Sequence, residues 1–360
     1  MKHYRMLALH ASAIVALSAL SSSCWYAKQG VAFAGERLSA RSLSSLARDR
    51  SSPPELLDFI ERVEDIRAFG VDELGLKPTK NYSAYVHSPK GYVADVVSAC
   101  AADSFERHYW AYPVVGKLPY KGFYNRDDAL KEVARLKARG LDVIMRPVEA
   151  FSTLGMARDP VYSFMRDWDA YRLAELILHE SVHATLFLKG QDQFNEEFAS
   201  FVGRKGAELY LVSRYGEASE LARVTALRRM DASRFTGFLK ETARLLESVY
   251  GRSDLSREEK LREKSRVITD RAALYKDEAQ SYDTVAYRSF DMGGINNAYL
   301  DLYRLYEDDP SLYEQLLEDK AQGSLKNLVT FAIATARDYR ALQKRKLAPP
   351  GMAEYLASSP

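Results

Sequence analysis

Residues 171–202 read YRLAELILHESVHATLFLKGQDQFNEEFASFV, and this stretch decides the fold. At its centre is an H-E-x-x-H motif made of His179, Glu180 and His183. Residues four apart on a helix lie about 40° apart around its axis, so the two imidazoles share one face. This spacing lets two ring nitrogens bind one metal ion at about 2.0–2.1 Å. Glu180 is placed to reach a water molecule at the metal rather than the metal itself.

The sequence on both sides of the motif favours a buried helix. Apolar residues surround the motif on nearly all sides, and Gly190 is the expected C-terminal stop. Histidine and glutamate side chains are costly to bury in such a helix unless they are paired or bound to a metal. A chance occurrence of the motif and a structural histidine pair without metal are the two alternatives.

A tetrahedral zinc site needs a third protein ligand, and residues 194–202, FNEEFASFV, offer one. Asn195 is a good helix N-cap, so we expect Glu196 to open a second helix. The segment resembles the N-E-x-x-A motif of the gluzincin metallopeptidases, in which the glutamate after the asparagine is the third ligand. The resemblance implies Glu196 as that ligand, with Glu197 as the weaker candidate. Without a metal, both acids would simply favour a helix N-terminus.

Composition limits the class of protein. The 360 residues include 47% hydrophobic residues, which is enough for one large domain with a sizeable core. The 51 basic and 49 acidic residues leave a net charge of +2, which argues against nucleic acid as a partner. A charged fraction of 28% excludes an integral membrane protein.

The N-terminus has the pattern of a targeting segment. Residues 1–5 are basic, residues 6–20 are apolar, and three serines precede Cys24. The apolar run is too short to span a membrane comfortably. The pattern resembles a bacterial lipoprotein signal, which predicts lipidation of Cys24 and a position in the cell envelope, anchored by lipid and facing the periplasm. The alternative is ordinary cleavage after Ala34, giving a mature chain that begins at Gly35.

If Cys24 carries lipid, Cys100 has no disulfide partner, and we expect it to be a small buried residue.

The order of patterns predicts an α+β fold that is mostly helical. A small sheet within residues 82–146, with one helix inserted at 127–139, precedes the zinc helix. A strand near 143–151 is either an edge strand, on which a peptide could lie by β-augmentation, or an ordinary core strand. The C-terminal half is helical, with a long charged hairpin over 216–278 and a capping box formed by Ser256 and Glu259. The predicted division is a signal peptide over 1–23, a lipoprotein stem over 24–55, a single metallopeptidase domain over 56–346 and a tail over 347–360.

Several segments together resemble one bacterial family, the zinc aminopeptidases of lipoprotein type. They are YPVVG at 112–116, YKGFY at 120–124, FSTLG at 151–155, DP at 159–160, HESVH, FNEEFAS and NNA at 296–298. The resemblance implies a gluzincin-like fold, one zinc ion and a membrane-anchored peptidase acting on peptide substrates.

Several parts of the mechanism are left open by the residues. Glu180 is expected to act as the general base. His183 is the last histidine of the chain, so the oxyanion would need another donor, and Tyr282, Tyr287 and Tyr299 lie in a suitable downstream region. An aminopeptidase also binds a free α-amine through carboxylates, and Glu149 and Glu175 are the acids upstream of the motif.

Two other functions remain: a membrane-anchored binding or scaffolding lipoprotein with a structural zinc, and a metallohydrolase of cell-wall peptide amides.

Overall fold

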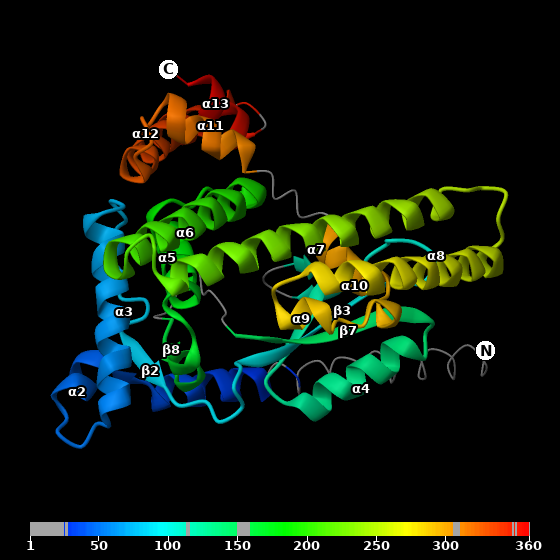
Figure 1. Cartoon of the computed structure of the whole chain (residues 1–360), viewed down its shortest axis with the longest axis horizontal. Helices are drawn as coiled ribbons and strands as arrows, with labels where there is room; N and C mark the ends of the chain where they lie inside the picture. The colour runs from blue at the N-terminus through cyan, green and yellow to red at the C-terminus, as the bar shows by residue number, and fades with distance from the viewer. Residues whose placement is uncertain are drawn as a thin grey trace, which may run out of the picture.

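The computed structural model describes residue 25 and residues 28–112, 116–149, 159–304, 310–347, 349 and 351–359. The predicted signal peptide, Cys24 and the segment 151–155 lie outside these residues. The described chain is α+β and mostly helical, as the sequence predicted (Figure 1).

The N-terminal part of the described chain is packed rather than extended. A helix over 28–39 leads into β1 (Arg41–Ser42) and α2 (Leu43–Arg48), whose Leu43 and Leu46 are buried in the main core. β1 pairs antiparallel with β2 (Ala84–Val86), and β2 pairs in parallel with β8 (Val161–Tyr162). The predicted stem therefore packs against the rest of the domain from residue 28 onward.

The small sheet that precedes the zinc helix was correctly predicted. β3 (Ala94–Ala101) lies between β6 (Tyr120–Phe123) and β7 (Leu141–Val148), antiparallel to both, while β4 (Trp110–Tyr112) pairs with β5 (Gly116–Leu118). α4 (Arg126–Lys137) covers one face of this sheet. Among the described strands, β7 lies at the edge, which is the position that peptide pairing would require.

Two antiparallel helices form the centre of the molecule: α5 (Ala170–Thr185), which carries the motif, and α6 (Asp192–Tyr215). β8 and a 3₁₀ turn, η1 (Ser163–Asp167), lead into α5. α3 (Pro54–Asp72) and α12 (Leu325–Lys344) bury apolar faces against this pair, with α11 (Ser311–Asp319) beside them (Figure 1). Burial of each large apolar side chain in such a core stabilises the fold by about 1.5–3 kcal/mol. Part of the predicted tail forms α13 (Met352–Ser358), whose Met352 and Leu356 join the same core.

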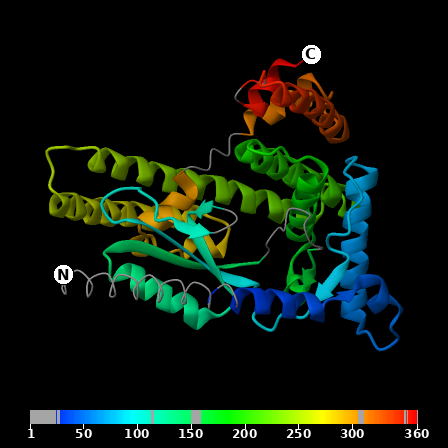
Figure 2. The same ribbon diagram turned by 180° about the vertical axis from the view of Figure 1, so that it is seen from behind.

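The charged hairpin consists of α7 (Glu220–Tyr250) and α8 (Arg257–Glu278), which extend away from the α5–α6 pair (Figure 2). The capping box of Ser256 and Glu259 is confirmed. After α8 the chain continues through η2 (Ala279–Ser281), α9 (Val285–Arg288) and η3 (Met292–Gly294) to α10 (Asn297–Arg304). The inner face of the hairpin and these short elements enclose a second apolar cluster, rich in tyrosine and phenylalanine.

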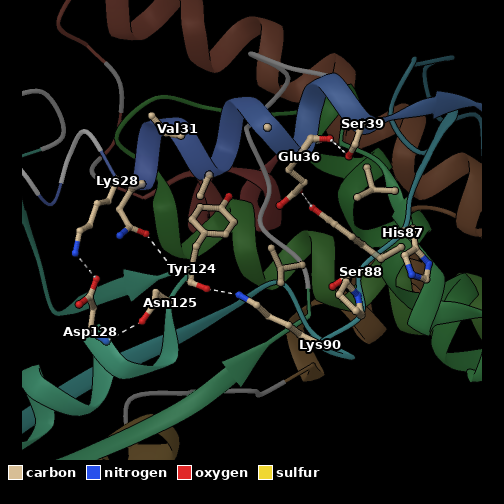
Figure 3. A pocket seen from close by; sticks show the side chains of 17 residues that line it. Lys28, Val31, Glu36, Ser39, His87, Ser88, Lys90, Tyr124, Asn125 and Asp128 are labelled. Carbon is tan, nitrogen blue, oxygen red and sulfur yellow. Dashed lines mark hydrogen bonds and ion pairs between the residues drawn. The ribbon is translucent and has the colours of Figure 1, made fainter.

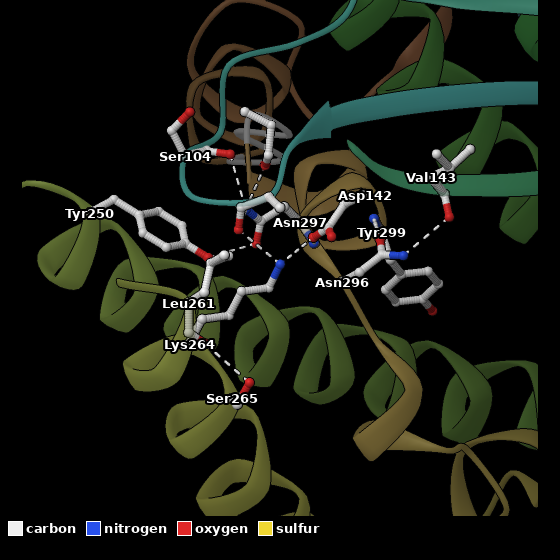
Figure 4. A network of polar contacts seen from close by, with 12 residues as sticks. Ser104, Asp142, Val143, Tyr250, Leu261, Lys264, Ser265, Asn296, Asn297 and Tyr299 are labelled. Atoms are coloured by element: carbon white, nitrogen blue, oxygen red, sulfur yellow. Dashed lines mark hydrogen bonds and ion pairs between the residues drawn. The ribbon is translucent and has the colours of Figure 1, made fainter. Parts of the chain in front are cut away.

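A buried polar network joins the hairpin to the sheet (Figure 4). The side-chain amide of Asn297 donates to the carbonyl oxygens of Ala101 and Ser104, both at 2.9 Å, and accepts from the Tyr250 hydroxyl at 2.8 Å. The Lys264 ammonium bonds to the Asp142 carboxylate at the start of β7. Each buried polar group thus has a partner, and the network fixes where β7 begins.

Two further observations concern the membrane and the cysteines. Within the described ranges, no helix combines the length and the apolar character needed to cross a lipid bilayer. Cys100 is buried and free, and burial raises the pKa of its thiol to about 12, so the prediction of a small buried residue rather than a nucleophile is confirmed.

Candidate metal centre

The motif helix is shorter than the sequence predicted. Asp169 caps its N-terminus by accepting from the Arg172 N–H at 2.9 Å. It ends at Thr185 and not at Gly190, which has φ of 77° in the turn before α6. The hydroxyls of Ser181 and Thr185 bond back to carbonyls four residues earlier, both at 2.7 Å, and such bonds weaken the end of a helix.

The prediction that Asn195 is an N-cap is wrong. α6 begins one turn earlier, at Asp192, with Gln191 as its N-cap, and Asn195 is buried within the helix. Its side-chain amide accepts from the Leu188 N–H at 2.9 Å and donates to the Leu188 carbonyl at 2.8 Å. Asn195 therefore holds the connecting loop against α6, and this clamp fixes the position of its neighbour Glu196.

The structure brings together the three predicted ligands, His179, His183 and Glu196. The two Nε2 atoms are 3.1 Å apart, and the Glu196 carboxylate oxygens lie 3.5 Å from Nε2 of His183 and 3.7 Å from Nε2 of His179. Ligand atoms about 2.0–2.1 Å from a tetrahedral zinc ion stand roughly 3.3–3.4 Å from one another. The separation of the two Nε2 atoms and the shortest distance from each to the Glu196 carboxylate, which end on different oxygens, are within a few tenths of an ångström of this length. The donor set and its closeness therefore fit a zinc ion.

The side chain of Glu197 is used elsewhere. It accepts from the Gln193 amide at 2.8 Å and from the Tyr313 hydroxyl at 3.1 Å. Tyr313 in turn packs against Phe198 and Phe201 of α6. Among the described residues, Glu196 rather than Glu197 thus joins the two histidines.

The backbone of α6 orients the first histidine. The His179 ring forms a hydrogen bond with the Ala199 backbone, which only partly opposes the lowering of the pKa of His179 by burial. A Cβ atom at Gly203 would stand 3.0 Å from Cβ and 3.1 Å from Cα of His179, so only glycine lets the two helices approach this closely. The ring is therefore held on one side while its Nε2 faces the other two ligands.

Burial and neighbouring charge set opposite protonation tendencies for the two imidazoles. Burial, and then the charge of His183, lower the pKa of His179 to about 4. Burial also lowers the pKa of His183, but hydrogen bonding to Glu196 and the charges of Glu196 and Glu180 outweigh it and leave the value raised. The bond to His183 lowers the pKa of the Glu196 carboxyl despite its partial burial. The cluster thus favours an ionised Glu196 and a neutral His179, as metal binding requires, whereas the acidic neighbours favour a proton on His183 that a metal ion would have to displace.

Glu180 lies on a different side of α5, in a buried environment with Tyr82 as a neighbour. Glu180 is 8% exposed and Tyr82 is 3% exposed. Burial, followed by the charge of Glu180, raises the pKa of the Tyr82 hydroxyl well above its usual range, which indicates that the two side chains are close. Tyr82 also has φ of 58°, a left-handed conformation that costs a non-glycine residue free energy and that recurs near functional sites.

The three downstream tyrosines considered as oxyanion donors lie away from the motif. Tyr282, Tyr287 and Tyr299 pack in the aromatic cluster of the hairpin, where Phe235 and Tyr275 are among their neighbours. The Tyr282 hydroxyl bonds to Glu278 at 3.2 Å, and the Tyr299 hydroxyl lies 3.4 Å from that of Tyr303. None of the three is part of the core cluster that contains α5 and α6.

A cavity of about 1010 Å³ lies beside the N-terminal half of α5. Glu175 lines it, one helical turn and about 6 Å along the axis before His179. Arg204 of α6 lines the same cavity, and its charge affects both Glu175 and His179. Burial raises the pKa of Glu175 in spite of this arginine and of Arg229. The other upstream acid, Glu149, follows β7 and forms an ion pair with Arg172, which ties the end of the edge strand to α5.

With this geometry in view, the sequence was compared with known proteins. Residues 26–347 match a protein family described as "Putative aminopeptidase". The chain belongs to this family. Separate searches of curated proteins and of solved structures each gave no match. Membership in this family suggests peptidase activity, and the match covers the sheet, the motif helix and the hairpin alike.

Sequence reasoning missed Gly203, Tyr82, Tyr313 and the clamp formed by Asn195. Gly203 carries one detectable signal, because glycine is disfavoured inside a helix unless a close approach requires it. Tyr82 and Tyr313 carry none, since they are 2 of 23 tyrosines and reach the site only through tertiary contacts.

Proposed function

We propose that this family member is a zinc-dependent peptidase whose single metal ion is held by His179, His183 and Glu196. The observation that carries the proposal is the convergence of three ligand residues: the two Nε2 atoms are 3.1 Å apart, and the Glu196 carboxylate faces both, with Oε1 3.5 Å from His183 and Oε2 3.7 Å from His179. When bound there, zinc would act as a Lewis acid on the substrate carbonyl and would lower the pKa of a water molecule towards 7.

The chain's own residues supply the proton chemistry. Glu180 is adjacent to the ligand His179 in sequence and close enough to His183 for its charge to affect that imidazole. It accepts the proton of the attacking water and delivers it to the leaving nitrogen. The neighbouring Tyr82, fixed in its strained conformation, limits the positions that the Glu180 side chain can take.

The exposure of the site supports an enzyme over a scaffold with a structural zinc. The side chain of His183 is 4% exposed, whereas that of His179 is 22% and that of Glu196 is 58% exposed. Structural zinc sites are closed by four protein ligands, and catalytic sites keep one position open to water and substrate. Three ligands with one open side agree with a catalytic site.

The cavity beside α5 is lined by none of the three ligand residues, but it offers a carboxylate for the α-amine that an aminopeptidase would bind. Glu175 is a carboxylate that lines it one turn before His179 and could bind the α-amine of a peptide substrate. β7, an edge strand tied to α5 through Glu149 and Arg172, offers main-chain groups with which an extended peptide could pair. Glu149 is already engaged by Arg172, so its substitution serves as the matched control for Glu175.

We further propose that the protein is anchored in the bacterial cell envelope through lipid on Cys24 and faces the periplasm. The basic, apolar and serine-rich segments before Cys24 support this proposal. Mass spectrometry of the membrane fraction should find diacylglycerol on Cys24. A soluble mature chain that begins at Gly35 would contradict it.

The test of the proposed function combines metal content with substrate range. The purified protein should hold one zinc per chain, and His179→Ala and Glu196→Ala should lose it, whereas Glu197→Ala should retain it. Zinc uptake should weaken in acid because protons compete for the same ligand atoms.

Peptides with free N-termini should be hydrolysed, and Glu175→Gln should raise KM for them much more than Glu149→Gln does. Cleavage of blocked peptides would indicate an endopeptidase, and cleavage only of cell-wall peptide amides would indicate the other hydrolase.

A further inference from the structure

The helix over 28–39 has its polarity reversed relative to an ordinary surface helix. Its two adjacent charged residues point towards the domain, where Arg37 forms an ion pair with Asp159 at 3.1 Å and Glu36 accepts a bond from the Tyr162 hydroxyl. Its outward side carries Val31 and Leu38, which are 74% and 87% exposed. These are the two highest exposures among the large apolar side chains that the structure describes.

The exposed apolar residues form one continuous face. Val31 and Leu38 are seven residues apart, or about two helical turns, so they lie on the same side of the helix. Ala34 lies between them on that side and is also exposed. Glu36 lies about 140–160° from these three residues around the axis, and Arg37 lies about 100–120° from Leu38 and Val31. A surface helix usually shows the opposite arrangement, so this face needs a cover other than water.

A hollow lies beside the helix (Figure 3). This cavity of about 740 Å³ has Val31 and Gly35 on its helix side and Val86, Pro89 and Val93 on the side of the domain. Polar side chains, among them Glu36, Ser88 and Lys90, line the same hollow, so the outward face of the helix adjoins a hollow of mixed character.

The length of the chain before the helix indicates what covers this face. Lys28, the first residue of the helix in the described range, follows Cys24 by only four residues. Four residues span at most about 14 Å even when fully extended. A lipid on Cys24 thus holds the start of the helix within about 14 Å of the bilayer surface. An amphipathic helix that lies at that surface buries its apolar face by about 5–10 Å.

We propose that the face of this helix carrying Val31, Ala34 and Leu38 lies on the phospholipid surface to which the protein is anchored. The inference rests on the lipid anchor proposed above and is separate from the peptidase reaction. The lipid chains supply most of the affinity, so a small apolar face is enough to fix the orientation of a tethered domain. A second copy of the chain fits this face less well, because a few side chains fall far short of the roughly 1,000 Å² that a stable interface buries.

The first experiment uses the lipidated protein in vesicles of phosphatidylethanolamine and phosphatidylglycerol. Tryptophan is placed at Leu38, or at Leu274 of α8 as a control that is 57% exposed. Brominated lipid should quench the added fluorescence of Leu38→Trp by at least several-fold more than that of Leu274→Trp. Equal quenching at both positions, or no quenching at Leu38→Trp, would overturn the proposal.

The second experiment removes the anchor by Cys24→Ser and measures cosedimentation with the same vesicles. The additional changes Val31→Asp and Leu38→Asp should weaken binding at least tenfold. Control changes at two other exposed apolar residues, Leu274→Asp and Val285→Asp, should alter it less than twofold. Zinc content and peptide hydrolysis in solution should be the same in all variants, which separates this surface from the metal centre. A dimer that Val31→Asp and Leu38→Asp abolish, or a mature chain that begins at Gly35, would contradict the membrane as the cover.

Discussion

The α5–α6 pair and the α7–α8 hairpin both bury polar side chains, but they do so in different ways. In the hairpin, the Arg271 guanidinium lies 3.7 Å from the centroid of the Phe238 ring and donates to Thr242 and Glu241 at 3.0 and 3.2 Å. In the α5–α6 pair, Nε2 of both histidines and the Glu196 carboxylate converge on one point, and Nδ1 of His183 is buried without a hydrogen-bond partner among the described residues. Burial of polar groups alone thus does not mark a functional site. Convergence of ligand atoms does.

The largest expected effect is on catalysis in the α5–α6 pair. Glu180→Gln keeps the size of the side chain but removes the base, so peptide hydrolysis should fall by about 10²–10⁴-fold. Zinc content should stay near that of the parent, because Glu180 is not a ligand. The matched control is Glu241→Gln in the hairpin, which should leave activity unchanged. If Glu180→Gln kept full activity, the site would not be the catalytic centre we propose.

The next effect tests how closely the two helices approach. Gly203→Ala places a methyl group 3.0–3.1 Å from His179 atoms, including its backbone, so α5 and α6 must separate slightly. We expect a loss of about 1–3 kcal/mol in the free energy of unfolding and at least tenfold weaker zinc binding. Urea unfolding and competition with a zinc chelator measure these two quantities.

Gly237→Ala in α7 is the matched control for Gly203→Ala. No atom lies within 4 Å of the methyl group that it adds, so it should stabilise the hairpin by about 0.5–1 kcal/mol. Equal behaviour of the two variants would show that the contact between Gly203 and His179 does not constrain the site.

A smaller effect is expected from the buried arginine of the hairpin. Arg271→Met keeps much of the apolar stem but removes the donor to the Thr242 hydroxyl and one of the donors to the Phe238 carbonyl, which should cost about 1–3 kcal/mol. Zinc content and kcat per folded molecule should not change, because the hairpin encloses a separate cluster. A change in kcat at constant folded fraction would show that the two regions are coupled.

The smallest effect is expected from the hairpin tyrosines. Tyr282→Phe, Tyr287→Phe and Tyr299→Phe should each keep peptidase activity within about twofold and cost less than about 1.5 kcal/mol in stability. A loss of 10²-fold or more in one variant would show that its hydroxyl reaches the reacting carbonyl in the complex with substrate.

The same contrast explains which features could be predicted from sequence. His179, His183 and the capping box of Ser256 and Glu259 depend on spacing within a single helix, which the sequence states directly. Asn195 was assigned the wrong role, because an asparagine near a helix start can cap that helix or, as here, bind the backbone of the preceding loop. Glu175 could not be placed, since the cavity that it lines is formed by residues far apart in the chain. The reversed polarity of the helix over 28–39 could not be predicted from sequence, because it depends on which side of this helix packs against the domain.

The clamp formed by Asn195 also has a consequence for folding. The α5–α6 pair provides all three proposed ligand residues and the Asn195 amide that holds the loop between the two helices. Only 13 positions separate His183 from Glu196. Closing such a short loop costs little chain entropy, and contacts between sequence neighbours form early. The α5–α6 pair can therefore assemble before α7 and α8 are available. A metal ion that binds at that stage would act as a nucleus on which the remaining helices condense.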